Sequence, residues 1–437
     1  MSASEAERTS QAAAPQRAHG DRLILRCGHM VHGGACIARS EDGEVIFVDG
    51  GIPGELCAVE LRHRRRKVWY GVAVEVLEPS EHRTTPPCPY VPECGGCQLQ
   101  HVSYQHQLTL KRDIVLDAMR RQKVELPEVR VHGMSEPWRY RWRGEFHVVP
   151  GQHGMRDAGL GFNRARSWTA IPVDDCLIHH ETVSRSLPAL REAVRGGGRE
   201  GLTVLHLTVG DGGRELLVRS KPRRGLDEAA IDAAAQTLPD GINWNTDSTT
   251  LEWRGHLFRV MPESFIQVNQ EMVGVLYGLA LDALGDVQGA RVVDGYAGIG
   301  VLSTAVAETA GEVVCIEENP VAVHMGRLNA TMNGVDDRLR YVCAPVEKAL
   351  AQVAAEAPVD AVVLDPPRAG CEGGVTGWLA LAGPQRVVYV SCDPATLARD
   401  LHVLASSGPY QVAGFDLVDM FPQTHHVESV VELRRRR

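Results

Sequence analysis

The stretch Arg291–Gly300, RVVDGYAGIG, decides the fold of the C-terminal part of this chain. A short apolar run ends in an acidic residue and passes into a glycine-rich turn before a helix-forming sequence, which is typical of the first strand–turn–helix unit of a nucleotide-binding sheet. Glycines let the backbone approach a ligand at a helix N-terminus. The third glycine of a dinucleotide fingerprint would fall at Ser303, so the turn alone does not identify a ligand. A tight turn without a ligand is the alternative.

The same pattern repeats downstream. Further strand-like runs occur at Glu312–Glu317, Leu339–Ala344, Ala361–Asp365 and Arg386–Cys392. Helix-forming sequence lies between most of these runs, and this alternation predicts a doubly wound parallel sheet. The last two strands, Gln411–Met420 and Glu428–Leu433, have a connection too short for a parallel crossover, so we expect this pair to be antiparallel.

The N-terminal half has a different texture. Residues 21–80 contain short strand-like runs separated by turn sequences, which predicts a small β-barrel of the oligonucleotide-binding kind. Residues 1–20 are predicted to be a disordered tail. Residues 81–265 are predicted to form a mixed α+β central domain, with a strand at Tyr140–Val149 and a helix at about 101–124 that packs on the C-terminal domain of residues 266–437.

Composition limits the class of protein. The 437 residues are 44% hydrophobic and 23% charged, which excludes a disordered or collagen-like chain. No run approaches the length of a membrane span, and the polar N-terminus lacks a signal peptide, so a cytoplasmic location is expected. The net charge of −9 excludes a uniformly basic nucleic-acid-binding surface but allows local basic patches. Eleven cysteines without a secretory signal indicate metal, redox or nucleophilic chemistry.

Two local basic patches are candidate RNA contacts. The first is Arg64, Arg65, Arg66 and Lys67, followed directly by Trp69 and Tyr70. Cations beside aromatic rings suit a polyanion with stackable bases, although a solvated hairpin tip would look the same. The second is Arg139, Arg141 and Arg143, whose alternation would place them on one face of a strand, toward phosphate or solvent.

Three chemically capable residues are predicted to share one edge of the C-terminal sheet. Asp365 ends the fourth strand in the sequence LDPPR, and Cys392 follows the fifth. An antiparallel strand starts where its parallel neighbours end, so Glu428 joins the same edge, where open sheets bind ligands. A thiolate nucleophile and a carboxylate base would then face one pocket. Each residue also has an alternative interpretation. Asp365 could belong to a proline-stiffened loop without a ligand, Cys392 could be a core cysteine, and Glu428 could be a surface residue at a strand end.

A second group of cysteines has the spacing of a metal site. Cys88, Cys94 and Cys97 are spaced C-x5-C-x2-C, and Cys176 is the candidate fourth ligand. Zinc sites usually show two close pairs, so three plus one favours a [4Fe–4S] cluster over zinc. Three other cysteines are expected to be interior residues of the barrel: Cys27, Cys36 and Cys57.

These pieces together resemble the RNA uracil-5-methyltransferase family, in the form with an N-terminal TRAM domain and an iron–sulfur cluster. The resemblance covers the chain from about Asp21. It is carried by CPYVPECGGCQLQH, SFIQVN, LDPPRAG, VSCDPATLARD and HHVES, in this order. It implies an α/β protein with an OB-like TRAM barrel, a mixed α+β central domain with an iron–sulfur site, and a C-terminal Rossmann-like class I methyltransferase domain.

The resemblance also implies roles for individual residues. It implies Cys392 as nucleophile, Glu428 as base, and Cys88, Cys94, Cys97 and Cys176 as cluster ligands. Together with the glycine turn, it predicts contacts to S-adenosylmethionine from Gln267, Tyr296, Gly298, Gly300, Glu317 and Asp365. The chain departs from the family pattern at four positions. The family commonly has Cys where this chain has Ala297, and Asn where it has Val301 and Asp393. A further cofactor contact of the family would fall near Ala344, which has no polar side chain.

The implied reaction is methylation of C5 of a uridine in RNA. Uracil C5 is a poor nucleophile, so the Cys392 thiolate would add at C6, and Glu428 would remove the C5 proton after methyl transfer. The substrate is expected to be 23S ribosomal RNA, with the tRNA T-loop as alternative, and the protein a monomer. Three rivals remain: methylation of cytosine C5, methylation of base amino groups, and an RNA-binding factor with a vestigial methyltransferase domain.

Overall fold

Residues 17–222 and 224–436 are described in a computed structural model of the chain. The chain divides into two compact units, Met1–Thr84 and Thr85–Arg437. Most of the predicted tail, residues 1–16, lies outside the described residues. Its last residues are attached to the barrel, because the Gly20 amide donates a hydrogen bond to the Leu61 carbonyl at 2.8 Å.

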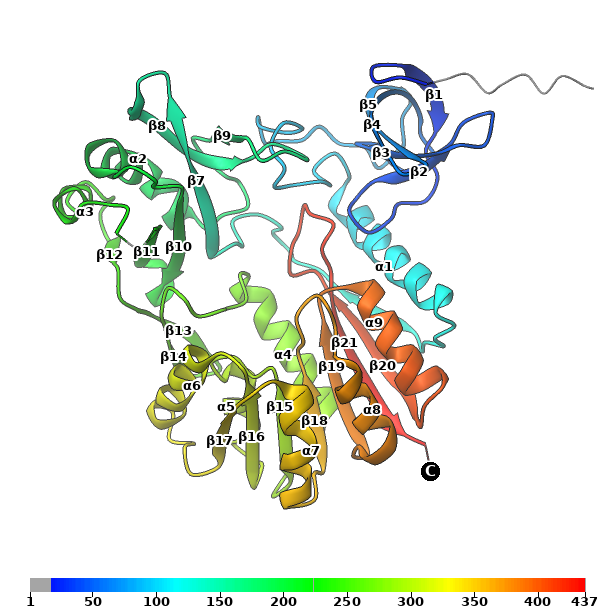
Figure 1. The fold of residues 1–437 in the computed structure, drawn as a ribbon, viewed down its shortest axis with the longest axis vertical. Coiled ribbons are helices and arrows are strands. Elements are labelled where there is room, and N and C mark those ends of the chain that lie inside the picture. The colour runs from blue at the N-terminus through cyan, green and yellow to red at the C-terminus, as the bar shows by residue number, and fades with distance from the viewer. Residues whose placement is uncertain (1–16, 223, 437) are drawn as a thin grey trace, which may run out of the picture. The chain divides into compact units, whose positions relative to one another are not determined.

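The first unit is a five-stranded β-structure (Figure 1). Its strands are β1 (Arg22–Arg26), β2 (Cys36–Arg39), β3 (Val45–Asp49), β4 (Leu56–Arg65) and β5 (Val68–Glu78). The order is β1-β4-β5-β3-β2, and only the β3–β5 pair is parallel. The thiols of Cys27, Cys36 and Cys57 lie in its interior, as the sequence predicted. Strand β4 begins with mostly buried residues and ends in a charged, exposed tip.

The second unit contains a six-stranded sheet of order β12-β11-β10-β7-β8-β9. Its strands are β7 (Arg143–Gly151), β8 (Gly154–Asn163), β9 (Ala170–Pro172), β10 (Val204–Gly210), β11 (Glu215–Lys221) and β12 (Asn243–Asn245). Its helices are α2 (Glu181–Gly197), the 3-10 turn η1 (Asp211–Gly213) and α3 (Glu228–Ala235). The apolar face of α2 packs on the sheet through Val183, Leu187 and Leu190, all fully buried.

The same unit contains an eight-stranded sheet of order β17-β16-β15-β18-β19-β21-β20-β6. Its strands are β6 (Val129–His132), β15 (Arg291–Gly295), β16 (Glu312–Glu317), β17 (Leu339–Cys343), β18 (Ala361–Leu364), β19 (Arg386–Ser391), β20 (Tyr410–Val418) and β21 (Glu428–Arg435). The strands from β15 to β19 are parallel, and β21 is antiparallel to both β19 and β20, as the short connection predicted. Strand β6, which the sequence did not predict, extends the sheet by pairing with β20.

Helices cover this sheet between the strands (Figure 1). They are α1 (Tyr104–Arg121), α4 (Gln270–Leu284), α5 (Val301–Val306), α6 (Pro320–Met332), α7 (Val346–Glu356), α8 (Gly373–Ala382) and α9 (Pro394–Leu401), which continues as the π-helical turn η2 (His402–Ser406). The predicted helix at 101–124 is α1, and it packs against α9. A hairpin of β13 (Thr249–Trp253) and β14 (His256–Val260) packs on α6. None of the described helices has the length and apolar character needed to span a membrane.

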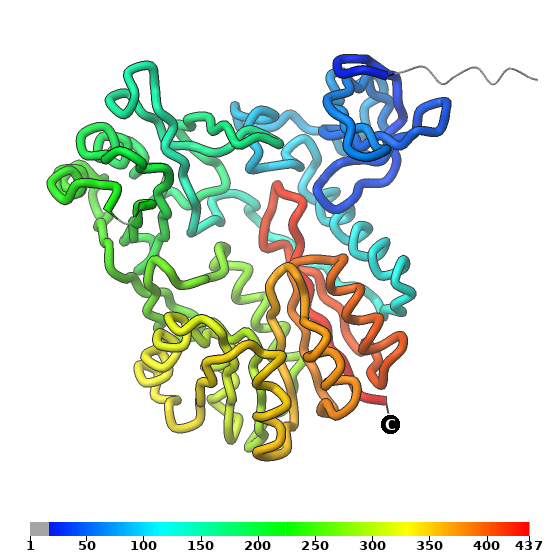
Figure 2. The backbone as a smooth tube through the Cα atoms, in the orientation of Figure 1, coloured from blue at the N-terminus to red at the C-terminus, as the bar shows by residue number. Residues whose placement is uncertain are grey.

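The connection between β20 and β21, residues 419–427, rises from the edge of the sheet as a red loop in Figure 2. A buried ion pair holds its first residue, because Lys111 Nζ of α1 lies 2.6 Å from Asp419 Oδ1. Both side chains are 2% exposed or less. The same ammonium donates to the Phe421 carbonyl at 3.0 Å. Burial lowers the pKa of Lys111, and Asp419 opposes that shift.

Lys111→Met should destabilise the fold by about 3–5 kcal/mol, because it leaves the Asp419 carboxylate buried without its cation. The free energy of unfolding, measured by denaturant titration, checks this value. The neighbouring Arg112→Met is the control, since Arg112 is exposed on the same helix and its replacement should change stability by only about 0.5 kcal/mol. Equal stabilities of the two variants would show that the buried pair contributes nothing.

Candidate active site

A cavity of about 690 Å³ lies at the carboxyl edge of the eight-stranded sheet. The structure brings seven of the eight predicted catalytic and cofactor residues to its wall: Gln267, Tyr296, Gly298, Glu317, Asp365, Cys392 and Glu428. The eighth, Gly300, does not line the cavity. This edge collects residues from several strands because parallel strands end together, and the antiparallel β21 begins there.

The glycine turn after β15 has the backbone shape that its sequence indicated. Tyr296, Gly298 and Gly300 all have left-handed φ values, of 67°, 55° and 83°. A Cβ at Gly300 would come within 2.4 Å of the Tyr341 hydroxyl, so this glycine shapes the turn. Glu317, at the end of β16, accepts a hydrogen bond from the Gly298 amide at 3.0 Å. The turn is therefore fixed from the neighbouring strand.

Two acidic side chains at this edge carry raised pKa values. Burial raises the pKa of Asp294 to about 7, with Asp365 and Glu317 adding repulsion and a hydrogen bond from Ser303 opposing it. Burial also raises the pKa of Asp365 to about 6. Perturbed carboxyl groups that converge on one cavity are typical of a functional site.

Cys392 and Glu428 are neighbours across an antiparallel pair of strands. Ser391 of β19 pairs with Ser429 of β21, so the next position in this register places Cys392 opposite Glu428. Burial, Glu428 and Asp365 raise the pKa of the Cys392 thiol to about 12. Burial and Asp365 also raise the pKa of Glu428 well above its usual range. Both groups therefore hold their protons more tightly than free side chains do.

Arg368 is the positive charge that opposes these shifts. Its guanidinium lowers the pKa of both Cys392 and Glu428, and it follows the rigid Pro366–Pro367 pair on the cavity wall. The LDPPR sequence predicted a role for Asp365 but none for Arg368. Phe421 and His426, from the connection between β20 and β21, also line the cavity and were not predicted. Their positions depend on the path of that connection, which has no local sequence signal.

A second cavity, of about 530 Å³, gathers the four predicted cysteine ligands: Cys88, Cys94, Cys97 and Cys176. Burial raises the pKa of Cys97 and of Cys176 to about 12, and the other thiols add repulsion. His179 Nδ1 lies 3.1 Å from Cys176 Sγ. Among residues 17–222 and 224–436, no three Cys, His, Asp or Glu side chains converge closely enough to hold a metal ion. The thiols thus surround a space.

The basic residues are distributed differently from the sequence prediction. Strand β7 begins only at Arg143, and Arg139 has a left-handed φ of 55°, so the three arginines do not share a strand face. Arg139 forms an ion pair with Asp175 at 2.6 Å. Arg143 donates to the carbonyl of Pro262 at 2.7 Å and to that of Ser264. Arg141 Nε donates to the Arg143 carbonyl at 2.9 Å and lines the thiol cavity.

The basic run of the first unit lies at the tip of the β4–β5 hairpin. Arg64 forms an ion pair with Glu44 at 2.9 Å and lies over the Trp69 ring, 5.8 Å from its centre. Arg66 takes a left-handed φ of 57° in the turn, next to Arg65 and Lys67. The side chains of this run are exposed at the tip.

Two of the departures from the family pattern lie in the cavity wall and two do not. Ala297 and Val301 line the cavity, whereas Ala344 and Asp393 do not. Asp393 is the N-cap of α9, and its Oδ1 accepts hydrogen bonds from the amides of Ala395 and Thr396, each at 2.9 Å. Asp and Asn serve equally well at an N-cap, so this departure preserves the local structure.

Comparison with known proteins identifies the family. Residues 241–436 match the family model of tRNA (uracil-5-)-methyltransferases. A 23S rRNA (uracil(1939)-C(5))-methyltransferase of Shewanella amazonensis is 32% identical over 94% of this chain and 95% of its own length. An uncharacterised RNA methyltransferase of Halalkalibacterium halodurans is 33% identical over 92% and 95%. The chain belongs to the RNA (uracil-5-)-methyltransferase family.

The fold of this methyltransferase agrees with a solved structure. The crystal structure of Pyrococcus abyssi tRNA (uracil-54, C5)-methyltransferase in complex with S-adenosyl-L-homocysteine has a TM-score of 0.71 and 22% identity, covering 94% of this chain and 99% of that one. The family assignment makes the protein an enzyme that transfers a methyl group from S-adenosylmethionine to C5 of uridine in RNA. It decides against methylation of cytosine or of base amino groups.

Asp294→Asn should change how stability depends on pH. The Asp294 carboxyl ionises at about 7 in the folded protein, against an ordinary value of 3.8. Between these values the folded protein holds a proton that the unfolded chain lacks, so the contribution of Asp294 to stability falls as pH rises from about 4 to about 7. The free energy of unfolding, measured across this range without cofactor, should decline more steeply for the native enzyme than for the Asn variant. Parallel curves would contradict the raised pKa.

Proposed function

We propose that this enzyme methylates uridine through a covalent bond between Cys392 Sγ and C6 of the uracil. The observation that supports the proposal is that Cys392 and Glu428, each next to the paired residues Ser391 and Ser429, line one cavity with the glycine turn. Addition of the thiolate at C6 makes C5 an enolate-like nucleophile. C5 then takes the sulfonium methyl group, and the donor sulfur keeps the electrons of the broken S–C bond and leaves as a neutral thioether. Glu428 removes the C5 proton. The electron pair of the broken C5–H bond restores the C5–C6 double bond, and the C6–S bond breaks with its electrons leaving on sulfur, so Cys392 departs as thiolate.

The charges around Cys392 decide when it can react. Burial and the neighbouring carboxyl groups of Glu428 and Asp365 raise the pKa of its thiol to about 12, which favours the protonated form. A positive charge lowers the pKa of a thiol, and Arg368 already supplies one. The positive sulfonium of the methyl donor would add a second. This arrangement would keep the nucleophile unreactive until the cavity is filled.

The residues around the glycine turn suit S-adenosylmethionine, which supplies an electrophilic methyl group when bound. Gln267, Tyr296, Gly298, Glu317 and Asp365 would hold it, because they line the cavity at the end of β15 and β16, where open sheets bind nucleosides. Glu317 offers a carboxylate for the ribose hydroxyls, and the acidic wall suits a cationic donor. Gly300 would act indirectly, by allowing the turn to pass beside Tyr341.

The thiol cavity suits a [4Fe–4S] cluster held by Cys88, Cys94, Cys97 and Cys176. The four thiols line one cavity, and their three-plus-one spacing favours a cluster over zinc, whose sites usually show two close pairs. Methyl transfer consumes no electrons, so the role proposed for the cluster is to organise the surrounding chain.

The substrate that we propose is 23S ribosomal RNA. It is the substrate named for the Shewanella amazonensis relative, which matches this chain over nearly its whole length. The TRAM-like first unit would bind RNA through the tip formed by Arg64, Arg65, Arg66 and Lys67. A tRNA T-loop uridine is the second candidate, since the Pyrococcus abyssi structure is of a tRNA enzyme.

Incubation with methyl-labelled S-adenosylmethionine and separated ribosomal and transfer RNA, both from cells lacking the gene, tests the reaction and the substrate together. The expected product is 5-methyluridine in ribosomal RNA, identified by nucleoside mass spectrometry. Cys392→Ala should abolish it, because C5 stays unactivated. Cys343→Ala, which alters an exposed thiol outside the cavity wall, is the control and should retain activity.

Glu428→Gln should allow the covalent bond and the methyl transfer but slow proton removal. A denaturation-resistant RNA–protein complex is therefore expected to accumulate with this variant and to be missing with Cys392→Ala. Label on cytidine or adenosine, or full turnover by Cys392→Ala, would overturn the proposed reaction. Label in transfer RNA alone would replace the proposed substrate with the second candidate.

Iron and acid-labile sulfide, measured in protein purified without oxygen, test the cluster. Equal amounts of iron and sulfide are expected in the native enzyme, and Cys97→Ser should lose both. Cys343→Ser is the matched control, because Cys343 is an exposed thiol at the end of β17 and does not line the thiol cavity. Zinc without sulfide would show that the four cysteines hold a different metal.

A further inference from the structure

The connection between β20 and β21 contains a strained residue at its centre. Gln423 is 3% exposed and has a left-handed φ of 69°, which residues other than glycine rarely adopt. Such a conformation persists only where surrounding contacts hold it, and it is most common at functional sites. The residue lies between Phe421 and His426, whose side chains line the catalytic cavity.

The main chain of Gln423 is held from the cysteine segment and from α1. Its carbonyl accepts hydrogen bonds from the amides of Gln98 and Leu99, at 3.1 and 2.9 Å. Its amide donates to Gln107 Oε1 at 3.0 Å. Gln98 directly follows Cys97, one of the proposed cluster ligands. The strained residue is thereby joined to the wall of the thiol cavity.

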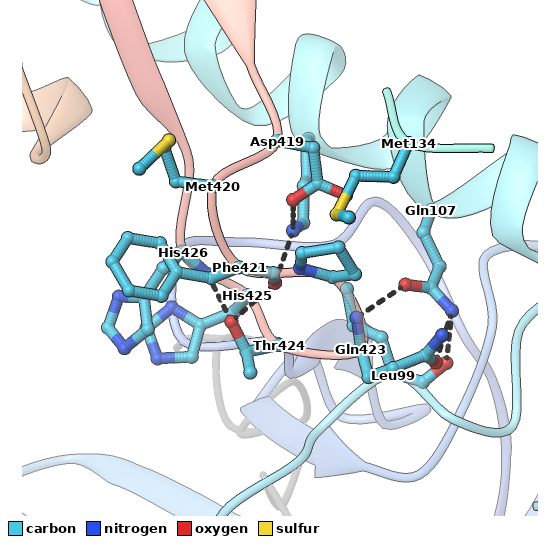
Figure 3. A network of polar contacts seen from close by, with 12 residues as sticks. Leu99, Gln107, Met134, Asp419, Met420, Phe421, Gln423, Thr424, His425 and His426 are labelled. Atoms are coloured by element: carbon cyan, nitrogen blue, oxygen red, sulfur yellow. Dashed lines mark hydrogen bonds and ion pairs between the residues drawn. The ribbon is translucent and has the colours of Figure 1, made fainter. Parts of the chain in front are cut away.

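Gln107 of α1 forms the centre of this network (Figure 3). The side chain is 1% exposed, and its Nε2 lies 2.9 Å from Gln423 Oε1, 3.1 Å from the Leu99 carbonyl and 2.9 Å from the Val102 carbonyl. One amide group therefore binds the cysteine segment and the catalytic connection at once. A buried amide whose oxygen and nitrogen both form hydrogen bonds holds its neighbours in one arrangement, which an apolar side chain would not do.

The same connection carries catalytic groups at its far end. Lys111 and Tyr140 hold its first part, through the carbonyls of Phe421 and Pro422 at 3.0 and 2.9 Å. The connection then runs through His426 to Glu428, the first residue of β21. A shift of Gln423 would consequently move the chain that leads to the proposed base, whereas Cys392, directly after β19, lies on a different segment.

We propose that Gln107 is a positioning residue that sets the location of Glu428 and links it to the cysteine segment. The proposal rests on the role of Glu428 given above. Gln107 touches no reacting atom, and it acts by holding Gln423 in the left-handed conformation. A displacement of about 1 Å at a reacting group can reduce the rate by about 100-fold, so this network can control turnover from outside the cavity.

Gln107→Leu tests the proposal, because leucine fills a similar volume without forming the hydrogen bonds. With ribosomal RNA from cells lacking the gene, kcat should fall between about 10-fold and 100-fold, and the KM for S-adenosylmethionine should change little. Because only proton removal is slowed, the covalent RNA–protein complex should accumulate. A merely structural defect would reduce complex formation together with turnover.

The matched control is Gln105→Leu, the same substitution at an exposed position of the same helix, which should behave as the native enzyme. Stabilisation by S-adenosylmethionine in thermal unfolding should be retained by Gln107→Leu, which shows that its cofactor site is folded. Gln423→Gly is the second variant, because glycine adopts the left-handed conformation without strain. It keeps the main-chain bonds and should lose less activity than Gln107→Leu.

The comparison with Glu428→Gln separates the two proposals. If Glu428→Gln accumulates the covalent complex and Gln107→Leu does not, the positioning role of Gln107 is overturned and the proposed reaction stands. If neither Glu428→Gln nor the native enzyme ever yields the complex, the proposed reaction itself fails. Native turnover by Gln107→Leu would also overturn the positioning role.

Discussion

The antiparallel insertion of β21 between β19 and β20 is the constraint on which the site depends. Parallel strands bring only their carboxyl ends to one edge, so a residue at the start of a strand reaches that edge only if the strand runs the other way. This reversal puts Glu428 opposite Cys392. The two residues belong to different segments of the chain, and both line the cavity that includes the turn after β15.

Desolvation controls the chemistry of this edge more strongly than any single contact. Asp294, Asp365, Cys392 and Glu428 all have pKa values raised first of all by burial. Several negative charges in one poorly solvated cavity would repel each other, so the site favours the protonated forms of these groups. Arg368 is the counter-charge within reach, and a cationic donor would complement the same field. The cavity is thus suited to a positive ligand.

The two cavities of the second unit share a wall. Glu263, Phe265 and Ile266 line both the thiol cavity and the catalytic cavity, and Arg143 anchors this segment through the carbonyls of Pro262 and Ser264. The network around Gln107 is a second link between the same regions. A change in the positions of the four thiols would therefore be transmitted to the catalytic cavity through the shared wall and through the network around Gln107. This link requires no electron transfer.

The sequence alone determined the features that depend on neighbouring residues: the apolar strands, the glycine turn, the cysteine spacing and the reversal of the last strand. It also placed Cys392, Asp365 and Glu428 at one edge, because strand direction follows from the length of the connections. Tertiary structure alone decided the rest. Arg139 departs from its predicted strand because it pairs with Asp175, and Gln423 takes a left-handed conformation because residues more than three hundred positions earlier, at Leu99 and Gln107, hold it there. Hydrogen bonds over such separations leave no periodic pattern in a sequence, since they depend on where the folded elements meet.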